Sequence, residues 1–381
     1  MTTPMKSSEK NRLRATQNTA AIAMAVLVLF LPLLSGQLAM QASYASAANN
    51  ANTGSATNAV NSVLFNKPFN LLITDQFNNR VIEVNPVTKQ IVWSFGSGNS
   101  KLCNPGPGSI IGSNDAERLS GGLTLMAGTG IPPGVPGTTA CVDNRVIVVD
   151  HSGNIVWQYG QAGVTGNGTN QLNVPVFAIQ LPNHDIMIVD QGNNRVIEVN
   201  LQKKIVWSYG PTSGPGALNN PNSAELLTNG HVLIADENNN RVIEITKAGQ
   251  IVWEYSQGLQ AAAFASRLPN GDTLITDSGH ARIVEVTKDK QVVFEYFTNT
   301  SLHSNPNPLP TNAVKLASGL ISIADQFNNR AIIIAPPAKT IMFQYGMTNV
   351  AGSGPDQLNG PYPAYSIGDY TGQTPPPTTF Q

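Results

Sequence analysis

Most of the chain is a succession of short apolar runs separated by turn residues. In one stretch the runs are 224–227, 232–235, 242–245 and 251–255, separated by Thr-Asn-Gly, Glu-Asn-Asn-Asn and Lys-Ala-Gly. Runs of four or five residues, rich in β-branched and aromatic side chains and bounded by such turns, are typical of antiparallel strands. The pattern therefore predicts four strands in this stretch. Because the runs are apolar on both faces, their sheet is expected to pack between two others.

This stretch recurs six times along the chain. Each copy has an arginine at the start of its third strand and an aromatic residue 12 or 13 positions later in its fourth. The arginines are Arg80, Arg145, Arg195, Arg241, Arg282 and Arg330, and the aromatic residues are Trp93, Trp157, Trp207, Trp253, Phe294 and Phe343. Four strands per copy at this period indicate the blade of a β-propeller. The sequence predicts an all-β, six-bladed propeller of four antiparallel strands per blade over residues 59–370.

The repeated motif carries a resemblance to known proteins. It combines Leu-Pro-Asn-Gly, as at 268–271, with Asp-x-x-Asn-Asn-Arg-Val and then Gly-x-Ile-Val-Trp-x-Tyr. This pattern resembles the NHL-repeat propellers and the related secreted lyase-like, quinoprotein-like and arylsulfotransferase-like propellers, and it covers nearly all of residues 60–370. The resemblance implies the fold. It does not specify the function, since the repeated residues build the blade and the chemistry of each family lies elsewhere.

The motif residues are interpreted as architecture, because a feature copied in every blade is normally structural. The aspartate ends the second strand and is expected to accept backbone amides across the loop. The asparagine pair tolerates a left-handed backbone, and the arginine can bond to the aspartate or to loop carbonyls. The aspartates are Asp75, Asp190, Asp236, Asp277 and Asp325. The tryptophans are expected to pack blade against blade, and Glu83, Glu198, Glu244 and Glu285 to be solvated on the third strands.

The N-terminal region reads as a secretory signal peptide. Four basic residues precede an apolar run over about 19–34, and Ala45-Ser46-Ala47 provides a cleavage site, so residues 1–47 are expected to be removed. An uncleaved membrane anchor is the alternative, but the run is short and Pro32 interrupts it. Residues 48–58 and 371–381 are expected to be a disordered lead and tail. The protein is predicted to be secreted, periplasmic or at the cell surface, without a membrane attachment after cleavage.

Composition and missing motifs narrow the function classes. Charged residues make up 12% of the chain and the formal net charge is −1, so no basic field for nucleic acid is expected. The sequence contains no G-x-S-x-G, phosphate-loop, H-E-x-x-H or C-x-x-C motif. We therefore expect no cofactor, no metal and no nucleic-acid partner, and we expect a monomer.

The second copy departs from the repeat. We call the face that carries the strand 2–3 loops and the links between blades the top face. Gly128 occupies the place of the motif aspartate, and the loop from there to Arg145 is 12 residues longer than in other blades. Cys141 lies in this Pro-rich insertion and Cys103 in the link entering the same blade, so a disulfide between them is predicted. It would either pin the loop or shape a pocket.

The fifth copy departs as well, because His280 and Ala281 replace the asparagine pair. His303 lies in the following link. Asp277, His280 and His303 are thus candidate top-face binding residues, and the two histidines are weak catalytic candidates. The alternative is that they are ordinary loop histidines, since a metal site needs three or four converging ligands.

Two functions follow as hypotheses. The first is an exported binding or protein-interaction module that recognises a small molecule, a glycan or a protein through its top-face loops. The second is a propeller enzyme of the lyase, hydrolase or sulfotransferase type with a top-face histidine.

The C-terminal region contains one further first strand. Residues 357–367 match residues 171–181 at Gln-Leu-Asn-x-Pro-x-x-Ala, but no second strand follows. An unpaired apolar strand would leave an open sheet edge. We predict that it joins the N-terminal blade as its innermost strand and closes the ring, with residues 59–65 pairing elsewhere. The alternative is that residues 59–65 supply that strand and the tail covers the rim.

Overall fold

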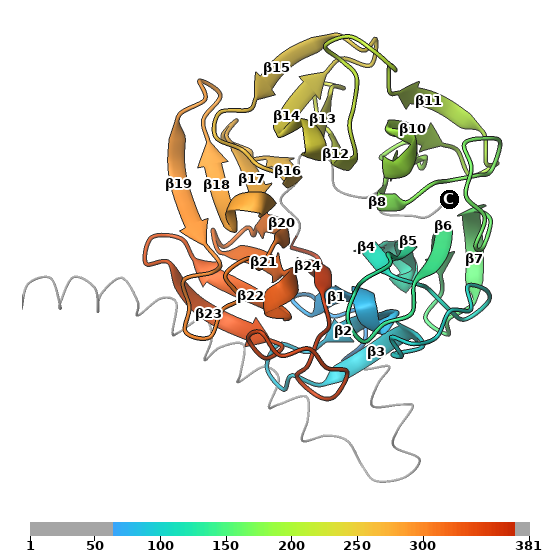
Figure 1. The fold of residues 1–381 in the computed structure, drawn as a ribbon, viewed down its shortest axis with the longest axis vertical. Helices are drawn as coiled ribbons and strands as arrows, with labels where there is room; N and C mark the ends of the chain where they lie inside the picture. The colour runs from blue at the N-terminus through green and yellow to red at the C-terminus, as the bar shows by residue number, and fades with distance from the viewer. Residues whose placement is uncertain (1–63, 370–381) are drawn as a thin grey trace, which may run out of the picture. The chain divides into compact units, whose positions relative to one another are not determined.

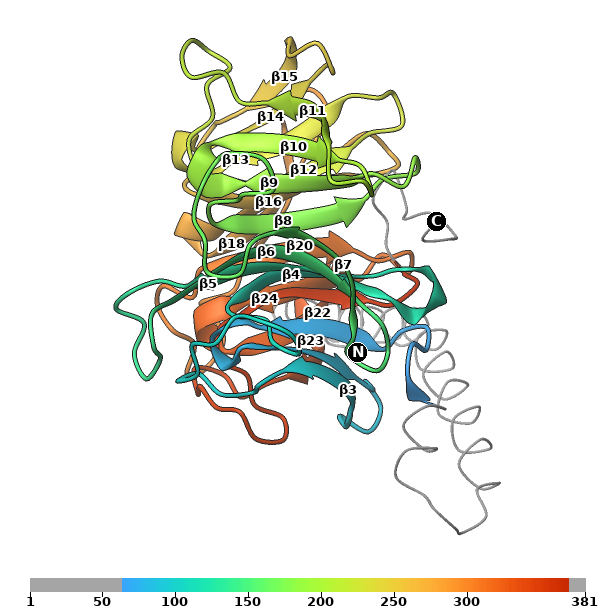
Figure 2. The ribbon, with the colours of Figure 1, turned by 90° about the vertical axis from the view of Figure 1, so that its right-hand side faces the viewer.

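The computed structural model describes residues 64–369, so the predicted signal peptide (1–47), lead (48–58) and tail (371–381) lie outside the described residues. Within this part of the chain, 24 strands form six antiparallel sheets of four strands each. The sheets are arranged around a central axis as the blades of a propeller (Figures 1 and 2). The predicted six-bladed, all-β fold is confirmed.

We number the blades along the chain and give the strands of each blade in order from the innermost, beside the axis, to the outermost. Blade one contains β24 (Pro361–Ser366), β1 (Leu71–Asp75), β2 (Arg80–Val84) and β3 (Ile91–Gly96). Blade two contains β4 (Ser113–Arg118), β5 (Thr124–Ile131), β6 (Cys141–Val149) and β7 (Ile155–Gly160). Blade three contains β8 (Pro175–Gln180), β9 (Ile186–Asp190), β10 (Arg195–Val199) and β11 (Ile205–Tyr209).

The other three blades repeat this arrangement. Blade four contains β12 (Pro221–Leu226), β13 (Val232–Asp236), β14 (Arg241–Ile245) and β15 (Ile251–Tyr255). Blade five contains β16 (Ala262–Arg267), β17 (Thr273–Asp277), β18 (Arg282–Val286) and β19 (Val292–Phe297). Blade six contains β20 (Pro310–Lys315), β21 (Ile321–Asp325), β22 (Arg330–Ala335) and β23 (Thr340–Tyr345).

The C-terminal strand closes the ring. β24 pairs antiparallel with β1, with Leu72 opposite Tyr365, and thereby becomes the innermost strand of blade one. The prediction for the closing strand is therefore confirmed. Of the segment 59–65, only residues 64 and 65 are described, and they are not in a strand. Phe65 instead packs against Trp93 and His151, with ring centroids 6.0 and 4.0 Å apart.

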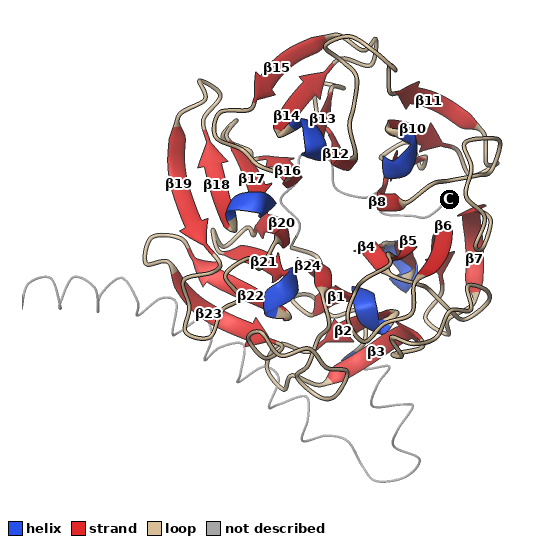
Figure 3. Cartoon of the chain, in the orientation of Figure 1, coloured by secondary structure: helices blue, strands red, loops and turns tan. Residues whose placement is uncertain are grey.

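The motif residues tie the strand 2–3 loop of each blade to the link that enters it. The loop is a short 3-10 turn in five blades (Figure 3). In blade one, the Arg80 Nε donates to Asp75 Oδ2 at 2.7 Å and the Asn359 amide donates to Asp75 Oδ1 at 2.7 Å. The second asparagine of the motif, Asn79, has φ 53°, the left-handed conformation that asparagine tolerates.

That second asparagine also joins neighbouring blades. Asn79 Oδ1 accepts the amide of Gly112, the residue before β4, at 2.9 Å. The same backbone amide to asparagine Oδ1 hydrogen bond recurs at four more junctions. The amides of Val174, Asn220, Ala261 and Gly360 donate to Asn144, Asn194, Asn240 and Asn329, respectively. At the junction of blades five and six the residue is Ala281, which has no side-chain acceptor for the corresponding amide of Leu309. This junction therefore lacks a bond that the other five have.

Replacing Ala281 with asparagine should stabilise the protein. Ala281 has φ 55°, a conformation that asparagine tolerates better than alanine, and the new side chain can accept the Leu309 amide. One such hydrogen bond contributes about 1 kcal/mol, so we expect the free energy of unfolding in urea to rise by about that amount. Ala281→Gly is the control, because it relieves the backbone without adding an acceptor. Equal stability of the two variants would contradict the hydrogen-bond contribution.

The third-strand glutamates are buried, so the prediction that they are solvated is wrong. Glu83 is 0% exposed and Glu285 is 6% exposed. Each pairs with a cation from the next blade, because the blades pack face to face and place the two side chains together. The four pairs are Glu83–Arg118, Glu198–Lys247, Glu244–Arg267 and Glu285–Lys315.

The tryptophans lie between blades, as the sequence predicts. Each indole Nε1 donates to a backbone carbonyl in the strand 3–4 turn of the next blade. The pairs are Trp93 to His151, Trp157 to Leu201, Trp207 to Lys247 and Trp253 to Lys288, at 2.9–3.1 Å. The hydrophobic core is likewise shared between neighbours, since Leu71 and Ile73 of blade one cluster with Ala324 and Tyr345 of blade six. The ring is thus held by contacts that cross from blade to blade.

Candidate functional site

The two cysteines form a disulfide on the top face. Cys103 lies in the link between β3 and β4, Cys141 begins β6, and their Cα atoms are 5.5 Å apart. The predicted disulfide is confirmed. It joins the long strand 2–3 loop of blade two to the link that enters the blade. A disulfide is compatible with an exported protein. Among the described residues, no helix has the length and apolar character needed to cross a membrane.

Blade two keeps the motif carboxylate but takes it from a different position. Asp143 stands where other blades have the first asparagine, and Arg145 Nε donates to its Oδ1 at 2.5 Å. The Ile111 amide donates to Asp143 Oδ2 at 2.7 Å, as a link amide does to the motif aspartate in blades one, three, four and five. A Cβ at Gly128 would lie 2.7 Å from Asp143 Oδ2. Glycine therefore stands at 128 because the relocated carboxylate fills the space.

His280 takes over the structural role of the first motif asparagine. Its Nδ1 lies 3.0 Å from Asp277 Oδ2, where Asn78 and Asn239 place their amides against Asp75 and Asp236 at 2.8 Å. The structure thus brings Asp277 and His280 together.

His303 lies in the link after β19 and is exposed. Among the described residues, no hydrogen bond or ion pair connects it to the Asp277–His280 pair. The described residues also contain no group of three or more His, Cys, Asp or Glu side chains able to hold a metal.

The channel along the axis is nearly closed towards the top face by polar side chains. Tyr362 Oη donates to Asn222 Oδ1 at 2.9 Å, and Asn222 Nδ2 donates to Glu237 Oε2 at 2.7 Å. Gln76 Nε2 donates to Asn114 Oδ1 at 2.5 Å. The cavity in this part of the channel measures only about 10 Å³. The network leaves little room for a ligand there.

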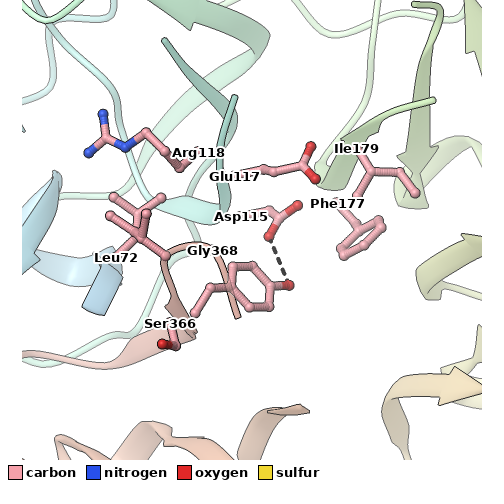
Figure 4. Close-up of a pocket in the computed structure, with 10 residues that line it drawn as sticks. Leu72, Asp115, Glu117, Arg118, Phe177, Ile179, Ser366 and Gly368 are labelled. Atoms are coloured by element: carbon pink, nitrogen blue, oxygen red, sulfur yellow. Dashed lines mark hydrogen bonds between the residues drawn. The ribbon is translucent and has the colours of Figure 1, made fainter. Parts of the chain in front are cut away.

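A larger cavity of about 230 Å³ lies in the channel towards the opposite, bottom face. It lies beside the innermost strands β4, β8 and β24, near the ends that lead into the strand 1–2 turns. Its apolar wall includes Leu72, Phe177, Ile179 and Ile367. Asp115 and Glu117 of β4 also line it and point the same way (Figure 4). We call this cavity the channel pocket.

The two carboxylates of the channel pocket accept backbone amides from the next blade. Asp115 Oδ2 accepts the Ala178 amide at 2.9 Å, and Glu117 Oε2 accepts the Gln180 amide at 3.0 Å. Burial raises the pKa of Asp115 to about 7, and the hydrogen bonds it accepts lower it only in part. Burial also raises the pKa of Glu117 to about 8, and the nearby charge of Asp115 raises it further. Each carboxylate can thus change charge near neutral pH.

Further polar groups adjoin the carboxylates. Tyr365 Oη donates to Asp115 Oδ1 at 3.4 Å, and Asn312 Nδ2 donates to Tyr365 Oη at 3.2 Å. Asn312 is 2% exposed, and its Oδ1 accepts no hydrogen bond. Asn312 lines the narrow part of the channel, which shares Asp115, Phe177 and Tyr365 with the channel pocket. An apolar wall with a few converging polar groups is the usual composition of a small-molecule site.

Sequence reasoning missed Asp115 and Glu117. A signal was available, because the first strands align at a shared alanine, and the residues flanking it differ from blade to blade. Asp115 and Glu117 flank Ala116, whereas Phe177 and Ile179 flank Ala178. Two acids on one first strand depart from the other blades, of which only blade four has an acid here, Glu225.

Comparisons with known proteins agree with the fold. Residues 142–306 match a family model described as outer membrane protein assembly factor BamB. No curated protein matches the chain in sequence. A protein of unknown function from Bacteroides caccae has a similar structure, with TM-score 0.54 and 15% identity over 73% of this chain and 93% of that one.

A more distant likeness is to virginiamycin B lyase from Staphylococcus aureus. It has TM-score 0.47 and 15% identity, and covers 76% of this chain and 87% of that one. The family match spans less than half of the chain. The chain is a six-bladed β-propeller, and within residues 142–306 it is similar to the propellers of the BamB family model.

Proposed function

We propose that the protein is an exported binding module that recognises a small molecule in the channel pocket by non-covalent contacts. The observation that carries this proposal is the cavity itself, with its apolar wall and the inward-pointing carboxylates of Asp115 and Glu117. Its volume of about 230 Å³ lies just below the roughly 300–1,000 Å³ of common ligand sites, which favours a small ligand. The match to an assembly-factor family and the disulfide support an exported binding role.

Recognition of a protein partner on the top face is a second candidate. Leu102 and Val142 flank the disulfide and are 48% and 44% exposed. Exposed apolar side chains beside a pinned loop favour a docking surface. The enzyme alternative stays a prediction. It receives less support, because His280 bonds to Asp277 as the motif asparagine does in other blades.

Blocking the channel pocket should abolish small-molecule binding. Ile179→Trp adds a large ring to the wall, so small molecules that bind the wild-type protein in a fragment screen should bind at least tenfold more weakly, as measured by calorimetry. Val206→Trp is the matched control, since it places the same ring on the exposed side of β11 in the same blade, where Val206 is 52% exposed. His280→Ala and His303→Ala should bind like the wild type. Binding that survives Ile179→Trp, or that is lost in the histidine variants, would contradict the proposal.

A further inference from the structure

Asp115 and Glu117 lack a cationic partner among the described residues. The nearest cation in sequence, Arg118, pairs instead with Glu83 at 2.8 Å. Its guanidinium also lies over the rings of Phe65 and Trp93, 4.4 and 4.8 Å from their centroids. Figure 4 shows Arg118 directed away from the two carboxylates. Asp115 is buried and Glu117 is half-buried, and within the described part of the chain neither has a counter-charge, which is costly when both are ionised.

Accepting a backbone amide does not explain the charge of Asp115. Blade four has Ser223 at the same position of its first strand, and the hydroxyl of Ser223 accepts the Ala265 amide at 3.2 Å. A neutral side chain thus performs the same task between blades four and five. Accepting this amide therefore does not require the ionisable group of Asp115.

Blade four also has a counterpart of Glu117. Glu225 Oε2 accepts the Arg267 amide at 2.8 Å. Burial lowers the pKa of Arg267, whereas the negative charges of Glu244 and Glu225 raise it. Glu225 therefore has a positive charge close to it, that of Arg267. The charge that acts on Glu117 is the negative charge of Asp115.

A second observation also favours a hydrogen-bond donor in the channel. Asn312 Oδ1 is a buried acceptor without a partner, and Asn312 is linked to Asp115 through Tyr365 Oη. Buried polar atoms are normally satisfied, so an orphaned acceptor beside a cavity indicates a missing donor. Asn312 lines the narrow part of the channel, which adjoins the channel pocket at Asp115, Phe177 and Tyr365, so this acceptor belongs to the same polar cluster as Asp115.

We infer that the ligand of the channel pocket is a small protonated amine, whose ammonium group pairs with Asp115 and Glu117 and whose apolar body contacts Phe177 and Ile179. This inference rests on the proposed function and specifies its ligand class. An ammonium group supplies both the counter-charge that the carboxylates lack and the donors that the acceptors lack.

The affinity for such an amine should rise with pH. The carboxylates must be ionised to attract a cation, and their pKa values of about 7 and about 8 mean that both are largely protonated at pH 6 and ionised by pH 9. The titratable and charged groups near them are Tyr365 and Tyr362 of β24 and Arg118 of β4, while Phe177 and Ile179 of β8 are apolar. Burial raises the pKa of Tyr362, so it stays neutral over this pH range, and Arg118 pairs with Glu83. The amine itself stays mostly charged up to about pH 9.

The test is a calorimetric titration of the full chain with matched probes. Phenethylamine and shorter alkylamines are compared with the corresponding alcohols, which keep the apolar body without the charge. At about pH 8.5 we expect the amines to bind at least tenfold more tightly than the alcohols. Near pH 6 we expect this ratio of affinities, the amine preference, to be at least fivefold smaller. Asp115→Ser, which copies Ser223, and Glu117→Gln should each remove most of the preference. Glu225→Gln is the control, and should retain it.

The outcomes separate this inference from the proposed function. If the alcohols bind as tightly as the amines, and Ile179→Trp abolishes both, the pocket binds a small molecule but the amine assignment is wrong. If neither series binds, the amine assignment is overturned. If small molecules found by the fragment screen bind but Ile179→Trp leaves them unaffected, the proposed function is overturned as well. Preference for the amines that persists in both carboxylate variants would also overturn the assignment.

Discussion

Deleting residues 357–381 should lower the melting temperature of the whole propeller. The deletion removes β24 and leaves β1 as an open edge beside the channel. It also removes the buried Leu358 and Ile367, which contribute about 1.5–3 kcal/mol each, and backbone hydrogen bonds worth about 1 kcal/mol each. We expect a loss of about 5 kcal/mol or more, seen as one earlier unfolding transition by calorimetry.

The control for this prediction is a shorter deletion, of residues 370–381, which keeps β24. It should melt within a few degrees of the full-length protein. If the longer deletion melts like the full-length protein, the strand is a surface extension and the ring is held by the other blade junctions. If both deletions destabilise equally, the effect belongs to the last twelve residues and not to closure.

Moving the carboxylate of blade two from position 143 back to position 128 should show that the effects of the two substitutions on the free energy of unfolding are strongly non-additive. Asp143→Asn removes the charge from beside Arg145, whose side chain is 1% exposed, and breaking a buried pair of this kind costs about 3–5 kcal/mol. Gly128→Asp alone places a Cβ 2.7 Å from Asp143 Oδ2 and adds a second buried carboxylate. Each single variant should therefore unfold at much lower urea concentration than the wild type.

The double variant Gly128→Asp/Asp143→Asn restores the aspartate, the asparagine pair and the arginine of the other blades. It should recover at least half of the sum of the two losses, because the new carboxylate can meet Arg145 as Asp236 meets Arg241. The Ile110 Cδ1 atom, also 2.7 Å from the added Cβ, is the end of a flexible side chain and can move. Additive losses in the double variant would show that the carboxylate of blade two is not interchangeable between the two positions.

Much of the fold could be predicted because the repeat is local. Strand, turn and motif lie within one copy of the repeat, so the period of Arg80, Arg145 and the later arginines was enough to count blades. The closing strand could be predicted for the same reason, since residues 357–367 match the entry to blade three. The disulfide followed once Cys103 and Cys141 were assigned to loops on one face of one blade.

The burial of Glu83 and its counterparts could not be read from a blade considered alone. A glutamate on an outer strand is ordinarily exposed, and here its exposure depends on Arg118, which lies 35 positions later and belongs to the next blade. The same limit applies to His280. The sequence shows a histidine where an asparagine is usual. Only the structure shows that this histidine contacts Asp277 in the way the asparagine contacts the motif aspartate of other blades.

The channel pocket depends on tertiary structure most of all. Its lining comes from β4 and β8 of consecutive blades and from β24, which reaches them only because it closes the ring in blade one. The repeat, through its apolar runs and turns, is sufficient to specify six blades and their order. The packing of side chains from different blades around the axis decides which end of the channel is filled. It also decides that Asp115 and Glu117 lie beside a cavity with no cationic partner in the part of the chain that the structure describes. Burial and pKa depend on neighbours in space, and neighbours in space are set by closure of the ring.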